Sequence, residues 1–220
     1  MGWVDGGRSA SSAESGALCI PTAAYAMPGG AGMAWRLICG SASNPLCELG
    51  WRSLGVLELT ALPSIKEEHW VPMVQETDTL LIGGGDCLYL CYWMRQSGLA
   101  DLLPSLRRET VYVGVSAGSM VVTPTSERPT TAVTRPPAAI ERWDWLIFRC
   151  ASAPGSREIS GEFLGHPERL AARIPVSTYA IEDQTAIKVT DGTVEVVSEG
   201  TGSCLPPNTE RLSGFAASLG

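Results

Sequence analysis

The chain has 220 residues, of which 45 % are apolar, and a formal net charge of −7. This length and apolar content predict a single α/β domain over residues 1–220. The acidic balance and the lack of any basic run argue against nucleic acid and anionic membranes as partners, because both require basic patches. No apolar run is long enough to cross a bilayer, and the N-terminal segment lacks the apolar core of a signal peptide.

Apolar strands alternate with helices up to residue 122. Continuous apolar strands separated by helices are typical of a parallel sheet covered on both faces, which predicts a three-layer α/β sandwich. Ser64 and Glu67 have the spacing of a capping box and predict a helix start at Ser64. The strands are expected at 17–21, 54–60, 79–82 and 110–116, and the helices at 33–40, 64–78, 88–98 and 100–109.

The pattern weakens beyond residue 122. Asp191 and Gly192 join two short apolar strands, and this dipeptide predicts a C-terminal β-hairpin over 185–198. The chain ends, residues 1–16 and 200–220, are polar or rich in glycine and serine and are expected to be poorly ordered. The remaining expectations are a loop at 123–137, strands at 143–148 and 176–183, and a helix at 167–174.

The seven cysteines are scattered without a CxxC pair. Most lie in apolar runs, which predicts reduced thiols in a cytoplasmic protein. The only histidines, His69 and His166, show no ligand spacing, so no zinc site is expected. No other metal or cofactor is expected. His69 follows an acidic pair beside Trp70 and is interpreted as structural.

Ser116 stands in GVSAG, which fits the G-x-S-x-G pattern of a nucleophile elbow. A strand precedes it and a helix is expected to follow it, so its hydroxyl would project from the sheet edge. The amide of Ala117, at the start of that helix, is the first candidate donor to an oxyanion. The alternative is a tight turn that needs only small residues.

Three glycines, Gly83–Gly85, follow the strand at 79–82. Such a loop leaves backbone N–H groups free or lets another backbone approach closely. In a parallel sheet this loop and Ser116 open on the same edge, so Gly84 and Gly85 are expected to complete the oxyanion hole. A phosphate-binding loop is the weaker alternative, because the G-x-G-x-x-G spacing and the P-loop lysine are both missing.

Three motifs in this order, LLIGGGDCLYL, VGVSAGSMVV and YAIEDQTAIKV, resemble the peptidase E and cyanophycinase family of serine hydrolases. The resemblance implies a flavodoxin-like fold similar to that of class I glutamine amidotransferases. It also implies Ser116 as nucleophile, a histidine base and an acid that orients it, with Asp183 as the acid and Glu182 as the neighbouring alternative. Two solvated acids in a turn are the other interpretation of that pair.

The sequence departs from the family at the position of the expected catalytic histidine. The resemblance implies a Phe-Pro-His segment after the strand at 143–148, whereas this chain has Arg149 and Cys150 there. A thiol does not replace imidazole, which titrates near neutrality and can both accept and return a proton. His166 is the only histidine further along and is the candidate base; a surface histidine before the helix at 167–174 is the alternative.

The expected function is a serine-type peptidase that hydrolyses small aspartyl peptides through an acyl-enzyme on Ser116, with His166 and Asp183 completing the triad. The expected partner is therefore a small peptide substrate, and a homodimer is left open. One alternative is a catalytically impaired relative that lacks the family histidine and binds a peptide or small molecule. Another is a flavodoxin-like binder of an anion at the glycine loop.

Overall fold

The computed structural model describes residues 11–42, 46–122, 145–149, 177–181, 185–190 and 193–198. Its elements fall into two compact units, one with the described elements up to Val122 and the other with those from Trp145 onwards. The helix expected at 167–174 and the loop expected at 123–137 lie outside the described residues, as do residues 1–10 and 199–220. Of the N-terminal segment expected to be poorly ordered, residues 11–16 contain a short 3₁₀ helix, η1 (Ser12–Glu14), and the first residue of a strand.

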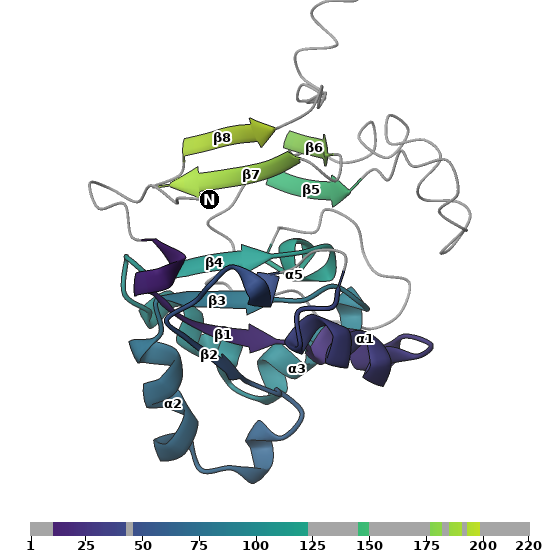
Figure 1. The fold of residues 1–220 in the computed structure, drawn as a ribbon. Coiled ribbons are helices and arrows are strands. Elements are labelled where there is room, and N and C mark those ends of the chain that lie inside the picture. The colour runs from purple at the N-terminus through teal and green to yellow at the C-terminus, as the bar shows by residue number, and fades with distance from the viewer. Residues whose placement is uncertain are drawn as a thin grey trace, which may run out of the picture. The chain divides into compact units, whose positions relative to one another are not determined.

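The first unit is built on a four-stranded sheet in the order β2-β1-β3-β4. Every neighbouring pair is parallel, with Ile20 opposite Ile82 and Ile82 opposite Gly114 at the carboxyl ends. Figure 1 shows the four strands side by side with helices lying beside them, so the predicted α/β fold with a parallel sheet is confirmed. The strands are β1 (Gly16–Ile20), β2 (Ser53–Val56), β3 (Thr79–Ile82) and β4 (Val111–Gly114).

The core lies around the two central strands, because every residue of β1 and β3 is buried. Leu80, Leu81 and Ile82 are at most 1 % exposed. Burial of each such side chain contributes roughly 1.5–3 kcal/mol. Leu54 and Val56 of β2 remain 38 % and 43 % exposed, so β2 is an exposed edge strand of the sheet.

Helices connect the strands at lengths that the parallel crossovers require. Asp86 caps α3, since its carboxylate accepts a hydrogen bond from the Tyr89 N–H at 2.7 Å, and Gly98, with φ 80°, follows the end of that helix. The helices are α1 (Gly30–Ile38), α2 (Glu67–Glu76), α3 (Cys87–Gln96), α4 (Leu99–Leu102) and α5 (Ala117–Met120), with 3₁₀ turns η2 (Thr22–Ala26), η3 (Leu46–Glu48), η4 (Leu62–Ser64) and η5 (Leu103–Ser105).

The predicted helix start at Ser64 is wrong. Ser64 ends η4, whose second residue is Pro63, and the Ile65 N–H closes this turn on the Leu62 carbonyl. Lys66 then has extended backbone, with φ −63° and ψ 139°, and α2 begins only at Glu67. The proline-containing turn therefore overrides the capping-box spacing.

The second unit contains two strand pairs. β5 (Trp145–Arg149) and β6 (Ser177–Ile181) are parallel to one another. β7 (Thr185–Thr190) and β8 (Thr193–Ser198) are antiparallel, and Thr190 pairs with Thr193, so the predicted C-terminal hairpin is confirmed. Lys188 and Glu195 face one another across this hairpin at 3.4 Å.

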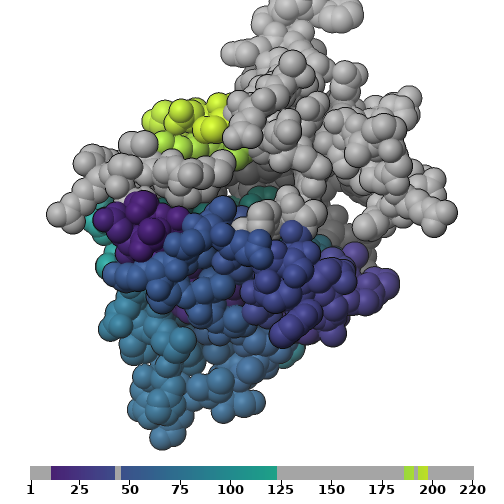
Figure 2. All heavy atoms as spheres, viewed as in Figure 1, coloured from purple at the N-terminus to yellow at the C-terminus, as the bar shows by residue number. Residues whose placement is uncertain are grey.

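The N-terminal residues pack against the segment that leads into β2. The Ser12 hydroxyl donates to the Leu49 carbonyl, and the Arg52 N–H donates to the carbonyls of Ser12 and Ser15. Figure 2 shows these purple N-terminal atoms in contact with blue atoms of that segment. Within the described ranges, no helix has the length and apolar character needed to span a membrane.

Candidate active site

The carboxyl ends of β3 and β4 bring two candidate segments to one sheet edge. The ladder continues past both strands, since the Gly83 N–H donates to Ile20 and the Val115 N–H donates to Ile82, each at 3.0 Å. The glycine loop after β3 and Ser116 after β4 are therefore neighbours, as the parallel topology predicts.

Ser116 has a strained backbone. Its φ of 52° and ψ of −115° make it the only non-glycine residue with a positive φ in the described part of the chain. Such a conformation costs about 1–3 kcal/mol and persists where the surroundings enforce it. Ser116 lies between β4 and α5, is half-buried, and its carbonyl accepts the N–H groups of Ser119 and Met120 at 2.9 and 3.0 Å.

The glycine loop lies beside Ser116. A Cβ placed on Gly84 would lie 3.2 Å from the Cβ of Ser116 and 3.7 Å from its hydroxyl oxygen. Gly85 has φ 146°, and a Cβ there would collide with the backbone of Ala23. Glycine is thus required at residue 85 by packing and conformation, and at residue 84 it allows the loop to approach the serine.

Three backbone donors in this region have no partner among the described residues: the N–H groups of Gly84, Gly85 and Ala117. By contrast, the neighbouring amides of Asp86 and Gly118 donate to the carbonyls of Ala23 and Val115. Gly84 and Gly85 are half-buried, and the first N–H groups of a helix have no partner within it, so these three donors are available to water or to a ligand. Their position beside Ser116 suits the binding of a developing oxyanion.

The Cys87 thiol and the Tyr112 phenol near this edge are neutral at physiological pH. Burial raises the pKa of the Cys87 thiol to about 12, and the nearby Cys91 and Asp86 raise it further. Burial also raises the pKa of the Tyr112 phenol, with an additional contribution from Cys87. Asp86 carries a carboxylate, but that group is the cap of α3. Neither the thiol nor the phenol is suited to accept a proton from Ser116 near neutral pH.

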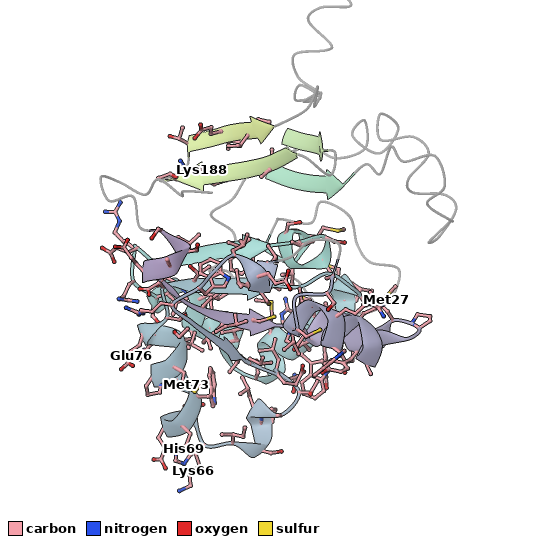
Figure 3. All side chains as sticks on the ribbon, viewed as in Figure 1. Met27, Lys66, His69, Met73, Glu76 and Lys188 are labelled. Carbon is pink, nitrogen blue, oxygen red and sulfur yellow. The ribbon has the colours of Figure 1, made fainter. Side chains whose placement is uncertain are left out.

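His69 is the only histidine in the described ranges, and it lies on α2. Its imidazole is 66 % exposed and 3.7 Å from the carboxylate of Glu68. Figure 3 places it at the far end of α2, well separated from α5. His166, Asp183, Glu182 and Cys150 lie outside the described residues, so the structure brings together Ser116, Gly84, Gly85 and Ala117 alone of the expected site.

Sequence reasoning missed Tyr112, whose hydroxyl donates to the Gly118 carbonyl at 2.7 Å. It also missed how close Gly114 and Gly118 are, since a Cβ on Gly114 would lie 2.5 Å from the carbonyl of Gly118. A tyrosine two residues before the first glycine of GVSAG is the only sequence signal for the contact. Within a strand, such a residue is not distinguishable from an ordinary core residue. No group of three or more histidine, cysteine or acidic residues suited to a metal occurs in the described ranges.

A strained serine between a parallel strand and a helix, beside unpaired loop amides, is the arrangement of hydrolases that use a serine nucleophile. The sequence model of peptidase family S51 matches residues 9–197, and the chain belongs to this family. The resemblance to peptidase E is thereby confirmed. A search of the curated proteins finds no match.

Two solved structures share the fold. One is a protein assigned as a peptidase E from Listeria monocytogenes EGD-e, with a TM-score of 0.58, 17% identity, and coverage of 86% of this chain and 89% of that one. The other is a peptidase from an acI-B1 Actinobacterium, with a TM-score of 0.55, 19% identity, and coverage of 88% and 81%. At these identities the similarity concerns the fold.

Proposed function

We propose that this member of the family is a serine-type peptidase of the peptidase E type, which hydrolyses small aspartyl peptides through an acyl-enzyme on Ser116. The observation that carries the proposal is the backbone of Ser116, held at φ 52° beside Gly84 at the carboxyl edge of the parallel sheet. The N–H groups of Gly84, Gly85 and Ala117, which have no partner among the described residues, support the proposal because they are available to an oxyanion.

In the proposed reaction, the Ser116 oxygen attacks the carbonyl carbon of the scissile bond while its proton passes to the base. The carbonyl oxygen becomes an oxyanion and accepts hydrogen bonds from Gly84, Gly85 and Ala117. Collapse of this intermediate breaks the C–N bond, and the base returns the proton to the leaving amine. Water then attacks the acyl-enzyme in the same way and releases the acid.

His166 is the proposed base, and Asp183 is the proposed acid that orients it. Both assignments come from the family motifs and the histidine content of the chain. A serine without a base keeps an ordinary hydroxyl, and the residual rate then comes from the oxyanion hole and binding, roughly 10³–10⁴ over water. The activity of the chain therefore depends on whether an imidazole serves Ser116.

Family S51 membership and the similarity to a peptidase E fold support a peptide as the substrate class. The aspartyl preference follows from the resemblance to peptidase E, whose substrates begin with aspartate. The reaction as proposed needs no metal or organic cofactor, because its only protein groups are a hydroxyl, amides, an imidazole and a carboxylate.

The test uses the full-length protein, a fluorophosphonate probe and an aspartyl dipeptide. We expect intact mass to show one adduct in the wild type and none in Ser116→Ala, with dipeptide hydrolysis lost in parallel. Ser105→Ala is the matched control, because Ser105 is exposed on η5 and its hydroxyl donates only to the Leu102 carbonyl. Labelling of Ser116→Ala at the wild-type rate would refute the proposal, as would a wild type that binds the dipeptide but neither cleaves it nor reacts with the probe.

A further inference from the structure

The helix that follows Ser116 is a single turn, and its carbonyls have few internal partners. α5 comprises Ala117–Met120, and the Ala117 carbonyl accepts the Val121 N–H at 3.0 Å. The Gly118 carbonyl instead accepts the hydroxyl of Tyr112 from β4, at 2.7 Å. A side chain of the preceding strand thus replaces the hydrogen bond that a longer helix would supply to this carbonyl.

This hydrogen bond acts at the point where α5 crosses the sheet. A Cβ on Gly118 would collide with the Ile82 carbonyl, and a Cβ on Gly114 would lie 2.5 Å from Gly118. The two glycines permit the close crossing, and the Gly118 N–H donates to the Val115 carbonyl at 3.0 Å within the turn. The phenol adds a hydrogen bond from a strand side chain, which fixes both distance and angle.

The phenol remains a donor over the working pH range. Burial raises the pKa of Tyr112, and the neighbouring Cys87 raises it further, so the hydroxyl stays protonated. Ser119 makes a second local contact, since its hydroxyl donates to the Ser116 carbonyl at 2.7 Å. That contact, however, connects two residues of the same turn and does not connect α5 to the sheet.

We propose that Tyr112 is a positioning residue for the reaction: through the Gly118 carbonyl it holds α5 on β4, so that the Ala117 amide keeps its direction toward the oxyanion. This inference rests on the proposed function, because it assigns a role in that same reaction. Tyr112 contacts neither substrate nor the reacting atoms.

Tyr112→Phe removes one oxygen and leaves the packing of the ring. The Gly118 carbonyl loses its partner, and α5 is expected to move by a fraction of an ångström. We expect kcat for an aspartyl dipeptide to fall about ten-fold, since small displacements of catalytic groups have effects of this order, while KM stays within about two-fold. Fluorophosphonate labelling should slow by a similar factor, and amide exchange at Met120 and Val121 should become faster.

Tyr92→Phe is the matched control, because Tyr92 is 52 % exposed on α3 and the substitution removes the same atom. Wild-type kcat in Tyr112→Phe would overturn the inference and leave the proposed peptidase intact. A parallel rise in KM, or loss of fold in circular dichroism, would also overturn it, because the hydroxyl would then serve binding or global stability. A wild type with neither hydrolysis nor labelling would overturn the proposed function, and the role of Tyr112 with it.

Discussion

Gly84 and Gly85 are adjacent in one loop, yet the structure predicts different consequences for alanine at the two positions: lost activity at Gly84 and lost stability at Gly85. At Gly85 the new Cβ would collide with the carbonyl and amide of Ala23, and φ is 146°. At Gly84 it would lie 3.2 Å from the Cβ of Ser116, 3.4 Å from the Val115 carbonyl oxygen and 3.7 Å from the Ser116 hydroxyl oxygen. Gly85→Ala should therefore lower the free energy of unfolding. Gly84→Ala should fold normally but have a lower kcat.

The magnitudes follow from these contacts. A non-glycine residue at a positive φ costs about 1–2 kcal/mol, and overpacking against backbone adds about 1–3 kcal/mol, so Gly85→Ala should lose about 2–5 kcal/mol of unfolding free energy. For a chain of this size that corresponds to a fall in Tm of roughly 5–20 °C. At Gly84 the neighbours need to shift by only a few tenths of an ångström. The gain from a stiffer unfolded chain, about 0.4–1 kcal/mol, offsets much of that strain.

The assay is thermal unfolding by circular dichroism together with dipeptide hydrolysis at a temperature where all variants are folded. We expect Gly84→Ala to keep its Tm within about 3 °C and to lose about ten-fold in kcat, because the displaced loop moves an oxyanion donor. Gly85→Ala with an unchanged Tm would refute the packing argument. Gly84→Ala with full activity would show that its amide does not face the oxyanion.

Three further predictions concern the surroundings of the site. Asp86→Ala should lower the unfolding free energy by about 1 kcal/mol in denaturant titrations, because α3 loses its N-terminal cap. At pH 8, iodoacetamide should alkylate Cys47 before Cys87 in peptide mapping: the hydrogen bond with Cys19 lowers the pKa of Cys47, whereas burial raises that of Cys87 to about 12. His166→Ala should abolish most hydrolysis if this histidine is the base; unchanged kcat in a folded variant would remove it from the mechanism.

The part of the site that sequence predicts is the part that local geometry determines. G-x-S-x-G after an apolar strand places a serine in a turn where only small neighbours fit, and Ser116 has that strained conformation. The parallel arrangement inferred from alternating strands and helices then puts Gly84 at the same sheet edge. Both predictions need only short segments and one rule about strand direction.

Features that depend on competition between neighbouring segments were not predictable. Ser64 and Glu67 have capping-box spacing, but the turn containing Pro63 closes first and delays the helix. Tyr112 alternates with apolar residues like any buried strand residue, and only the close approach of α5 reveals the acceptor for its hydroxyl. Sequence spacing does not encode that approach, because the distance between α5 and the sheet depends on the glycines, Gly114 and Gly118, that face one another there.

The strain at Ser116 also bears on the missing family histidine. Gly84, Gly114 and Gly118 leave room for this turn, the Tyr112 hydroxyl donates to the Gly118 carbonyl, and all four residues belong to the first unit. A strained conformation enforced by its own neighbours does not need a base to maintain it. Cys150, where the resemblance to the family implies histidine, therefore bears on proton transfer and not on the nucleophile or the oxyanion donors. Arg149→Pro together with Cys150→His should raise kcat for an aspartyl dipeptide, and an unchanged kcat in a folded double variant would contradict this expectation.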